Sequence, residues 1–239
     1  MKKYLLVSLI LLFSCEELQE SSNFLEYDFY MDEGWIAFQE DEWNLAVELF
    51  NTGLSSSSAS NFSEAFTGLG WTYMYRANLL PGEINKSNRD SLRILAENNF
   101  KNAKSEGTYG FNVWENALAG LTFIYSHIAD TALAAYFNDP GGPEPLLWDL
   151  MEEYSNKTLA ESDELLERAP GYNFNYDPCV NIDNIHVIRA RTYLRLDSLS
   201  QMLTELSNLT MLTCTVEPQT VQDGLDCLSE LSAELSTCN

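Results

Sequence analysis

Cys15 stands where an exported chain could be cut and chemically modified. The apolar run Leu5–Phe13 leads up to it, two lysines precede that run, and two glutamates follow the cysteine. The run is much shorter than the roughly 20 residues that a bilayer-spanning helix needs. A positive start, a short apolar stretch and a small residue before the cut are typical of a secretory signal. The Cys15 thiol is a nucleophile that could accept a lipid there.

The four residues that end at Cys15 resemble the lipobox of bacterial lipoproteins. Leu12-Phe13-Ser14-Cys15 has Leu three positions before the cysteine and a small Ser directly before it. The resemblance implies that residues 1–14 are removed and that the cysteine is acylated on its thiol and its new amino group. Several acyl chains attach a protein stably, because each buried CH₂ adds about 0.8 kcal/mol. A plain secretory signal with a chance cysteine is the alternative.

Four further cysteines lie in the last third of the chain: Cys179, Cys214, Cys227 and Cys238. In an exported chain an even number favours two disulfides. If residues 222–238 form one helix, Cys227 and Cys238 lie about 16 Å apart along its axis, too far to pair. Cys214 is then bonded to one of them and Cys179 to the other. A zinc site is disfavoured, because no CxxC spacing occurs.

The side chains suited to acid–base chemistry are few. His127 and His186 are the histidines of the chain, and both are expected to be packed residues. Common catalytic motifs such as GxSxG or HExxH are absent from the sequence. Glu152 and Glu153 are adjacent on a predicted helix and diverge by about 100°, so they form no catalytic pair by themselves. We therefore expect no enzyme, no cofactor and no metal site, although carboxylates distant in sequence could still meet.

The segment "NFNYDPCVNID" has the polar alternation of a calcium loop. Asn173, Asn175 and Asp177 alternate as ligands would, but Pro178 replaces the glycine that such loops need. Asn184 also stands where a bidentate glutamate belongs. The aromatic residues of this segment are instead expected to pack the loop onto the helices.

The charge of the chain limits its partners. The 239 residues carry a formal net charge of −23. This acidity repels phosphate backbones, so nucleic acid is not expected as a partner. Leucine and aromatic residues are plentiful enough for a packed core, which argues against a disordered acidic tail.

A motif recurs in the segments that must position these residues. Gly34-Trp35 and Gly70-Trp71 lie 36 residues apart, and an aromatic residue precedes each pair by four positions. Apolar and small residues fall at helical spacing around both, with a polar break at 39–42 in the first. Each segment therefore predicts a helix followed by a turn and a second helix.

This pattern resembles the tetratricopeptide repeat (TPR), a helix-turn-helix unit of 34 residues. The first repeat carries the expected aromatic and small residues at Tyr30, Gly34, Ala37, Trp43, Ala46 and Phe50. The second carries them at Phe66, Leu69, Gly70, Tyr73, Ala96, Phe100 and Ala103. It departs from the family pattern through residues 79–92, which we expect to lengthen the turn between its helices.

Two weaker repeats follow. A third first helix is predicted around 115–125, with a helical but less typical partner at 144–170, and a fourth lies at 184–199 with a turn at Asp197. An unrelated helical bundle is the alternative to this interpretation. The stretch 222–238 places leucines on one face and is expected to cap the last repeat.

The resemblance implies a concave groove lined by the first helices. By position, its lining is Trp35, Phe38, Gln39, Trp71, Met74, Tyr75, Leu121, Ile124 and Tyr125. An aromatic groove on an acidic body suits a segment with apolar anchors and basic flanks. The alternative is that the chain's own insertions cover several of these residues.

The sequence thus predicts an all-α, TPR-like α-solenoid with a C-terminal capping helix. The expected parts are a signal peptide at 1–14, a lipidated tether at 15–26, repeats at 27–210 and a disulfide-stapled cap at 211–239. The resemblance implies a non-enzymatic scaffold in a bacterial envelope, anchored in the outer membrane, facing the periplasm and binding a partner protein or peptide. The alternative is a lipoprotein that binds a glycan or small solute for a transporter. A scaffold predicts an open groove, whereas a solute binder predicts that Trp35 and Trp71 wall a cavity.

Overall fold

The computed structural model describes residues 26–56, 62–80, 82–106, 112–138, 144–215 and 218–235. The predicted signal peptide, Cys15, nearly all of the tether and Cys238 lie outside these ranges. Within them the chain is all-helical and consecutive helices pack against one another. A single isolated bridge pairs Asn173 with Asn181 in the described part. The all-α prediction is therefore confirmed.

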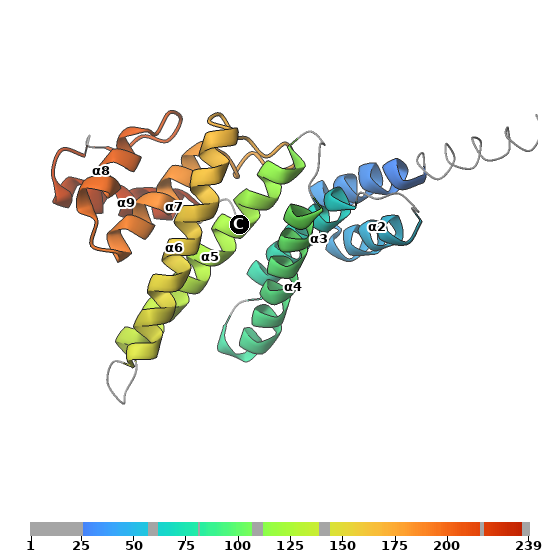
Figure 1. Ribbon diagram of the computed structural model, residues 1–239, viewed down its shortest axis with the longest axis horizontal. Helices are drawn as coiled ribbons and strands as arrows, with labels where there is room; N and C mark the ends of the chain where they lie inside the picture. Colours follow the sequence, from blue (N-terminus) through green and yellow to red (C-terminus); the bar gives the residue numbers. More distant parts are fainter. Residues whose placement is uncertain are drawn as a thin grey trace, which may run out of the picture.

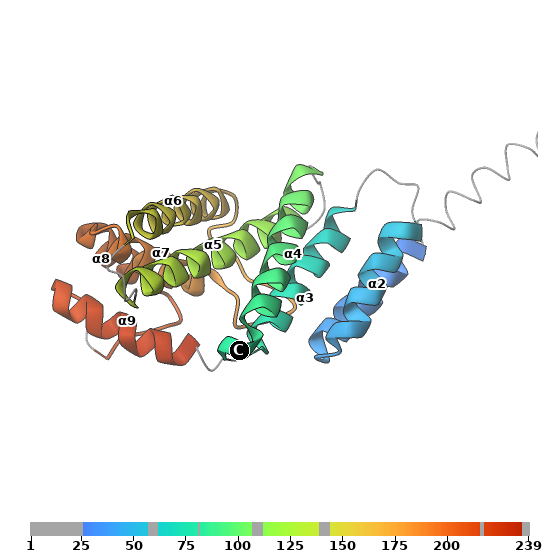
Figure 2. The same ribbon diagram turned by 90° about the horizontal axis from the view of Figure 1, so that it is seen from below.

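The helices follow one another along the long axis of the molecule (Figure 1). A first helix covers residues 26–39. It is followed by α2 (Trp43–Ser56), α3 (Ser63–Asn78), the short 3₁₀ helix η1 (Glu83–Asn85), α4 (Lys86–Ser105), α5 (Val113–Asn138), α6 (Pro145–Arg168), α7 (Ile182–Arg195), α8 (Leu199–Ser207) and α9 (Val221–Leu235). In the view from below, helix 26–39 with α2, α3 with α4, and α5 with α6 are seen as successive pairs (Figure 2).

Glycine allows the first pair and the next helix to approach closely. Phe50 of α2 is fully buried. Its ring lies against Gly34 of the first helix and Gly68 of α3. A Cβ at position 34 would lie 2.6 Å from Cε1 of Phe50, a distance at which atoms overlap. One ring thus fills the space that two glycines leave open.

The same contact recurs one pair later. Phe100 of α4 is fully buried and lies against Gly70 of α3 and Gly120 of α5. A Cβ at position 70 would lie 2.6 Å from Cδ1 of this ring. The repeated sequence motif therefore corresponds to a repeated packing arrangement, in which a phenylalanine of each second helix separates two first helices.

The insertion at 79–92 differs from the prediction. Only its first part is a connection, because η1 covers Glu83–Asn85 and α4 begins at Lys86. The side chain of Arg89, in the first turns of α4, donates to the carbonyl oxygens of Leu80 (3.0 Å) and Gly82 (3.2 Å). Residues 86–92 of the insertion contain no proline and form the start of α4, so the insertion lengthens this helix more than it lengthens the turn.

The helix α5 is the central element of the fold. By length and composition it could cross a bilayer, but most of its apolar stretch is buried inside the protein. It packs against α3, α4, α6 and α7. Its apolar character is therefore that of a core helix.

The C-terminal helices form a second core, in which α9 packs on α7 and α8. Leu228 and Leu231 of α9 are buried there. Cys214 and Cys227 form a disulfide with their Cα atoms 5.1 Å apart, which is one of the two pairings left open by the sequence. Cys179 is also disulfide-bonded. Its predicted partner in that case, Cys238, lies outside the described residues.

A buried carboxylate fixes the connection after α8. Asp183, in the first turn of α7, is fully buried. It accepts hydrogen bonds from the backbone N–H groups of Met211 (2.6 Å), Leu212 (2.7 Å) and Thr210 (3.0 Å). Burial alone would raise the pKa of Asp183, but these donors outweigh it and hold that pKa below its usual value.

Candidate functional site

The predicted groove residues Trp35 and Trp71 meet a segment from far along the chain. Phe174 is fully buried and stacks on Trp71, with ring centroids 4.5 Å apart. Tyr176 stacks on Trp35, with centroids 3.9 Å apart and planes 4° from parallel. We call residues 172–177 the plug. The prediction that the aromatic residues of this segment pack onto the helices is confirmed.

The surface of α3 and α5 on which the plug rests, which we call its seat, also provides hydrogen bonds. The Tyr172 hydroxyl donates to Oδ1 of Asn116 (3.0 Å), and the Trp71 indole donates to the carbonyl oxygen of the same asparagine (3.2 Å). The Tyr75 hydroxyl donates to the Asp177 carboxylate. Buried tyrosine and tryptophan need such partners, so the seat satisfies both the apolar and the polar parts of these rings.

An open aromatic groove is therefore not what the structure contains. Most of its predicted lining is less than 10% exposed. The buried residues are Trp35, Phe38, Trp71, Met74, Leu121, Ile124 and Tyr125. Tyr75 is half-buried and Gln39 is exposed. At Trp35, Phe38 and Trp71 the physical reason is that the chain supplies its own aromatic segment, which removes these rings from water.

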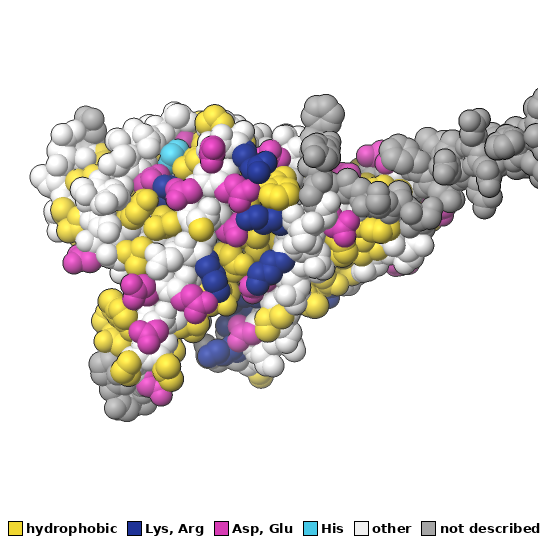
Figure 3. Space-filling view, viewed as in Figure 1, with side chains coloured by type: hydrophobic (Ala, Val, Ile, Leu, Met, Phe, Trp, Pro, Cys, Tyr) yellow, Lys and Arg dark blue, Asp and Glu magenta, His cyan; other side chains and the backbone are white. Residues whose placement is uncertain are grey.

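The predicted lining is also divided between two faces. Tyr125 does not face the plug. Its ring packs against Tyr154 of α6 at 5.5 Å, and Lys157 lies 5.8 Å from its centroid. Lys and Arg side chains gather over α4 and α6 on both sides of a strip of apolar surface (Figure 3). Lys104 of α4 forms ion pairs with Glu161 (2.8 Å) and Glu164 of α6.

The two histidines occupy structural positions. Nδ1 of His186 lies 2.7 Å from Oε2 of Glu205, whose other oxygen accepts from Arg189 (3.0 Å). His127 lies beside Thr131, with its ring 3.2 Å from that hydroxyl. Burial and the nearby Arg93 lower the pKa of His127 to about 4. This imidazole is neutral at physiological pH.

The described residues do not bring three or more His, Cys, Asp or Glu side chains together as a metal site would require. In the "NFNYDPC" stretch, the Asp177 carboxylate accepts from the backbone N–H of Cys179 (2.8 Å) and from Tyr75. The Asp177 oxygens therefore accept hydrogen bonds that hold the plug in place.

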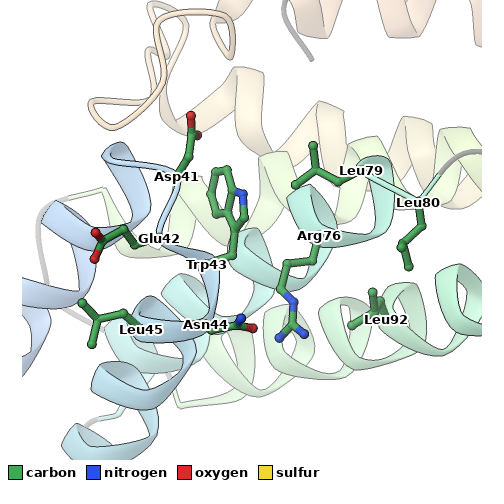
Figure 4. A pocket seen from close by; sticks show the side chains of 9 residues that line it. All are labelled: Asp41, Glu42, Trp43, Asn44, Leu45, Arg76, Leu79, Leu80 and Leu92. Atoms are coloured by element: carbon green, nitrogen blue, oxygen red, sulfur yellow. The ribbon is translucent and has the colours of Figure 1, made fainter.

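An open hollow lies next to the plugged groove, between the start of α2, the end of α3 and α4 (Figure 4). Its volume is about 550 Å³. The lining consists of Asp41, Glu42, Trp43, Asn44, Leu45, Arg76, Leu79, Leu80 and Leu92. Pockets of roughly 300–1,000 Å³ hold small ligands or the side chains of a peptide, so the hollow is large enough to bind.

A second, much smaller space lies beside Trp35. It measures about 30 Å³ and is lined in part by Glu64, Asn116 and Tyr176. Burial raises the pKa of Glu64, whose carboxylate accepts from the Trp35 indole (3.1 Å). The space suits a water molecule and is too small for a sugar ring.

The sequence pattern located the plug segment but not its seat. Residues Tyr75 and Asp177 are 102 positions apart, and helical periodicity carries no information about such a contact. The hollow was missed as well. Its one local signal is the pair Leu79-Leu80 at the start of the insertion, where the repeat pattern offers no place for buried leucines.

No protein-family model matches this chain, and comparison with curated proteins gives no match. The function must therefore be argued from the chain's own residues.

Proposed function

We propose that the chain is a lipid-anchored, TPR-like scaffold of a bacterial envelope that binds a partner protein and catalyses no reaction. The observation that carries the repeat architecture is the recurring packing of a phenylalanine between two glycines. Phe50 has this place in the first repeat and Phe100 in the second. Stacked helical pairs of this kind present extended surfaces, which favours binding to another macromolecule.

The lipobox resemblance at Cys15 supports the anchoring. In this proposal Cys15 carries the acyl chains in the outer membrane and the helical body faces the periplasm. The disulfide between Cys214 and Cys227 fits an oxidising compartment. Labelled palmitate should be incorporated into the wild-type chain and lost from Cys15→Ala, which should also leave the membrane fraction. A Cys15→Ala chain that keeps the label would refute the anchor.

The binding surface differs from the one that the family pattern implies. Trp35 and Trp71 are covered by Tyr176 and Phe174, so alanine substitutions there would test folding instead of binding. The partner is proposed to use surface outside the plugged groove.

Photocrosslinking in intact cells tests the scaffold function. A photoreactive residue would replace one exposed apolar residue at a time: Phe29, Leu79, Ile84, Phe137 or Leu146. A scaffold predicts a crosslink to one defined envelope protein from neighbouring positions on one face, and none from the others. If every position fails to crosslink at native expression levels, the partner-binding function is wrong.

Solute binding is the second candidate function, favoured by the volume of the hollow. A glycan or small solute would have to bind beside Trp43, because the space beside Trp35 holds about 30 Å³. This candidate predicts that a bound solute shields the Trp43 side chain from solvent.

A further inference from the structure

The hollow beside Trp43 has a firm base. The Trp43 ring stacks on Tyr75, with centroids 5.4 Å apart and planes 25° from parallel. Tyr75 in turn donates its hydroxyl to Asp177 of the plug. The base of the hollow is therefore continuous with the most buried aromatic contacts of the protein.

One wall of the hollow is also held in place. Leu79 and Leu80 follow the end of α3. Arg89 donates to the carbonyl oxygens of Leu80 and Gly82, which fixes this connection against α4. A surface that is already ordered loses little conformational entropy on binding. This wall of the hollow is therefore preorganised for binding a ligand.

The apolar part of the lining is exposed to solvent. Leu79 is 58% exposed and Leu45 is 42% exposed, and both line the hollow together with Leu80 and Leu92. A ligand that covers these exposed leucines would bind favourably, because removing apolar surface from water lowers the free energy.

The charges of the lining are arranged at separate places. Asp41 and Glu42 stand at the α2 end, whereas Arg76 projects between α2 and α4 (Figure 4). None of the three has an ion-pair partner among the described residues. The Arg76 guanidinium lies 6.0 Å from the Tyr73 ring centroid, so its donors remain available. The lining therefore offers two carboxylates and one guanidinium to an incoming ligand.

We propose that this hollow binds an amphipathic segment of the partner protein. Aliphatic side chains of the segment lie among the leucines, a Lys or Arg lies over Asp41 and Glu42, and a carboxylate of the segment pairs with Arg76. The net charge of −23 additionally favours encounter with a partner that is basic around this segment. The assignment rests on the proposed scaffold function and names its site.

A peptide titration tests the site independently of the partner. The probe is a capped 14-residue peptide with leucines at helical spacing, lysines toward one end and a glutamate toward the other. The full chain is placed in phosphatidylcholine nanodiscs, and calorimetry with empty nanodiscs corrects for binding of the probe to lipid. We expect Leu79→Asp to weaken binding at least tenfold.

Leu146→Asp is the matched control, because Leu146 is 73% exposed and does not line the hollow. It should leave the affinity within twofold of wild type. Equal weakening by both variants would mean that the probe binds the acidic surface without a site, which overturns the assignment. Thermal unfolding of both variants checks that the fold is kept.

Charge exchange gives a second test. Arg76→Glu should weaken binding of the probe. A second probe, in which lysine replaces the glutamate, should bind this variant more tightly than the first probe does. If the second probe binds no more tightly, the proposed pairing of Arg76 with a carboxylate of the ligand is wrong. The outcomes also separate this inference from the proposed function. A partner that crosslinks at Leu146 and not at Leu79 would support the scaffold function and contradict binding at the hollow. Peptide binding that depends on Leu79, without any crosslink in cells, would support the hollow as a binding site and contradict the scaffold function.

Discussion

The two ends of the molecule are held together by different means. From helix 26–39 to α5, the contacts are rings against glycine and ring against ring, as at Phe50 and Phe100. From α6 to α9, buried polar groups carry more of the packing. There Arg189 contacts Glu205 (3.0 Å) and Asp163 (2.6 Å), although its side chain is only 7% exposed.

This difference explains why the packing of a phenylalanine between two glycines recurs in the first part. Apolar packing is non-directional, so the same glycine and phenylalanine positions can serve in successive helical pairs. A buried arginine needs donors and acceptors at fixed distances, and such a network specifies one local geometry. The N-terminal part therefore uses one packing arrangement twice, whereas the polar contacts of the C-terminal part fix one local geometry.

The largest expected effect is in the apolar part. Phe100→Ala removes a fully buried ring between Gly70 and Gly120 and leaves a cavity between two helical pairs. We expect a loss of about 3–5 kcal/mol in the free energy of unfolding, measured by urea denaturation. Phe137→Ala, at a ring that is 72% exposed, should change stability by less than about 0.5 kcal/mol. Similar losses in the two variants would contradict the assigned packing.

The same division decides what could be predicted from the sequence. Gly34 and Gly70 recur 36 residues apart, and each is followed by a second helical segment with a phenylalanine, Phe50 or Phe100. This pattern correctly predicted the helices of the first two pairs. The glycines matter because no side chain fits beneath the rings, which is a property of local spacing. The all-α fold, the start of the last helix and the packing of the plug's aromatic residues followed from the same kind of local evidence.

The groove could not be predicted in this way. Its occupant, Phe174, comes from a connection whose path depends on the bridge between Asn173 and Asn181 and on contacts across the whole chain. The contacts of Arg189 were equally hidden, because Glu205 and Asp163 lie on other helices. The insertion was predicted as a longer turn because it departs from the repeat pattern, whereas in the structure α4 begins within it at Lys86.

The second largest effect is in the polar part. Asp183→Ala leaves the N–H groups of Thr210, Met211 and Leu212 without their acceptor, and we expect a loss of about 2–3 kcal/mol at pH 7. The pKa of Asp183 is lowered in the folded state, so its stabilisation is present above the unfolded pKa near 3.9 and is lost as pH falls through the lower folded value.

The stability difference between wild type and Asp183→Ala should therefore be complete at pH 7 and shrink below about pH 4. Denaturation curves at a series of pH values measure it. Asp226→Ala, on the exposed side of α9, is the control and should show a small difference that varies little with pH. A difference for Asp183→Ala that stays constant down to pH 2 would mean that its charge is not involved.

A smaller effect is expected where the two parts meet at the plug. Tyr176→Ala removes the ring stacked on Trp35 and should cost about 1–1.5 kcal/mol. The Trp35 indole resonance in nitrogen-15 NMR spectra should shift as its stacked neighbour is lost. Tyr136→Ala is the control, because that ring contacts Phe137 and Trp148, which lie outside the plug and away from Trp35. An unchanged Trp35 resonance would show that the plug does not rest there in solution.

The smallest effect tests α5, where His127 lies among charged residues of α4 and α5. Arg93 and Arg89 of α4 disfavour its protonation, whereas Asp130, which binds Arg195 of α7, and Asp90 favour it.

Burial and these charges lower the folded pKa to about 4, so between pH 6.5 and 4 the unfolded chain binds a proton that the folded chain does not. Stability is therefore lost as pH falls through this window, by roughly 1 kcal/mol once solvent screening is allowed for. His127→Phe should lose less over the same interval, and because both chains share every carboxylate, the difference between their denaturation curves at pH 6.5 and 4.5 isolates the imidazole. Equal losses would place the ring in water.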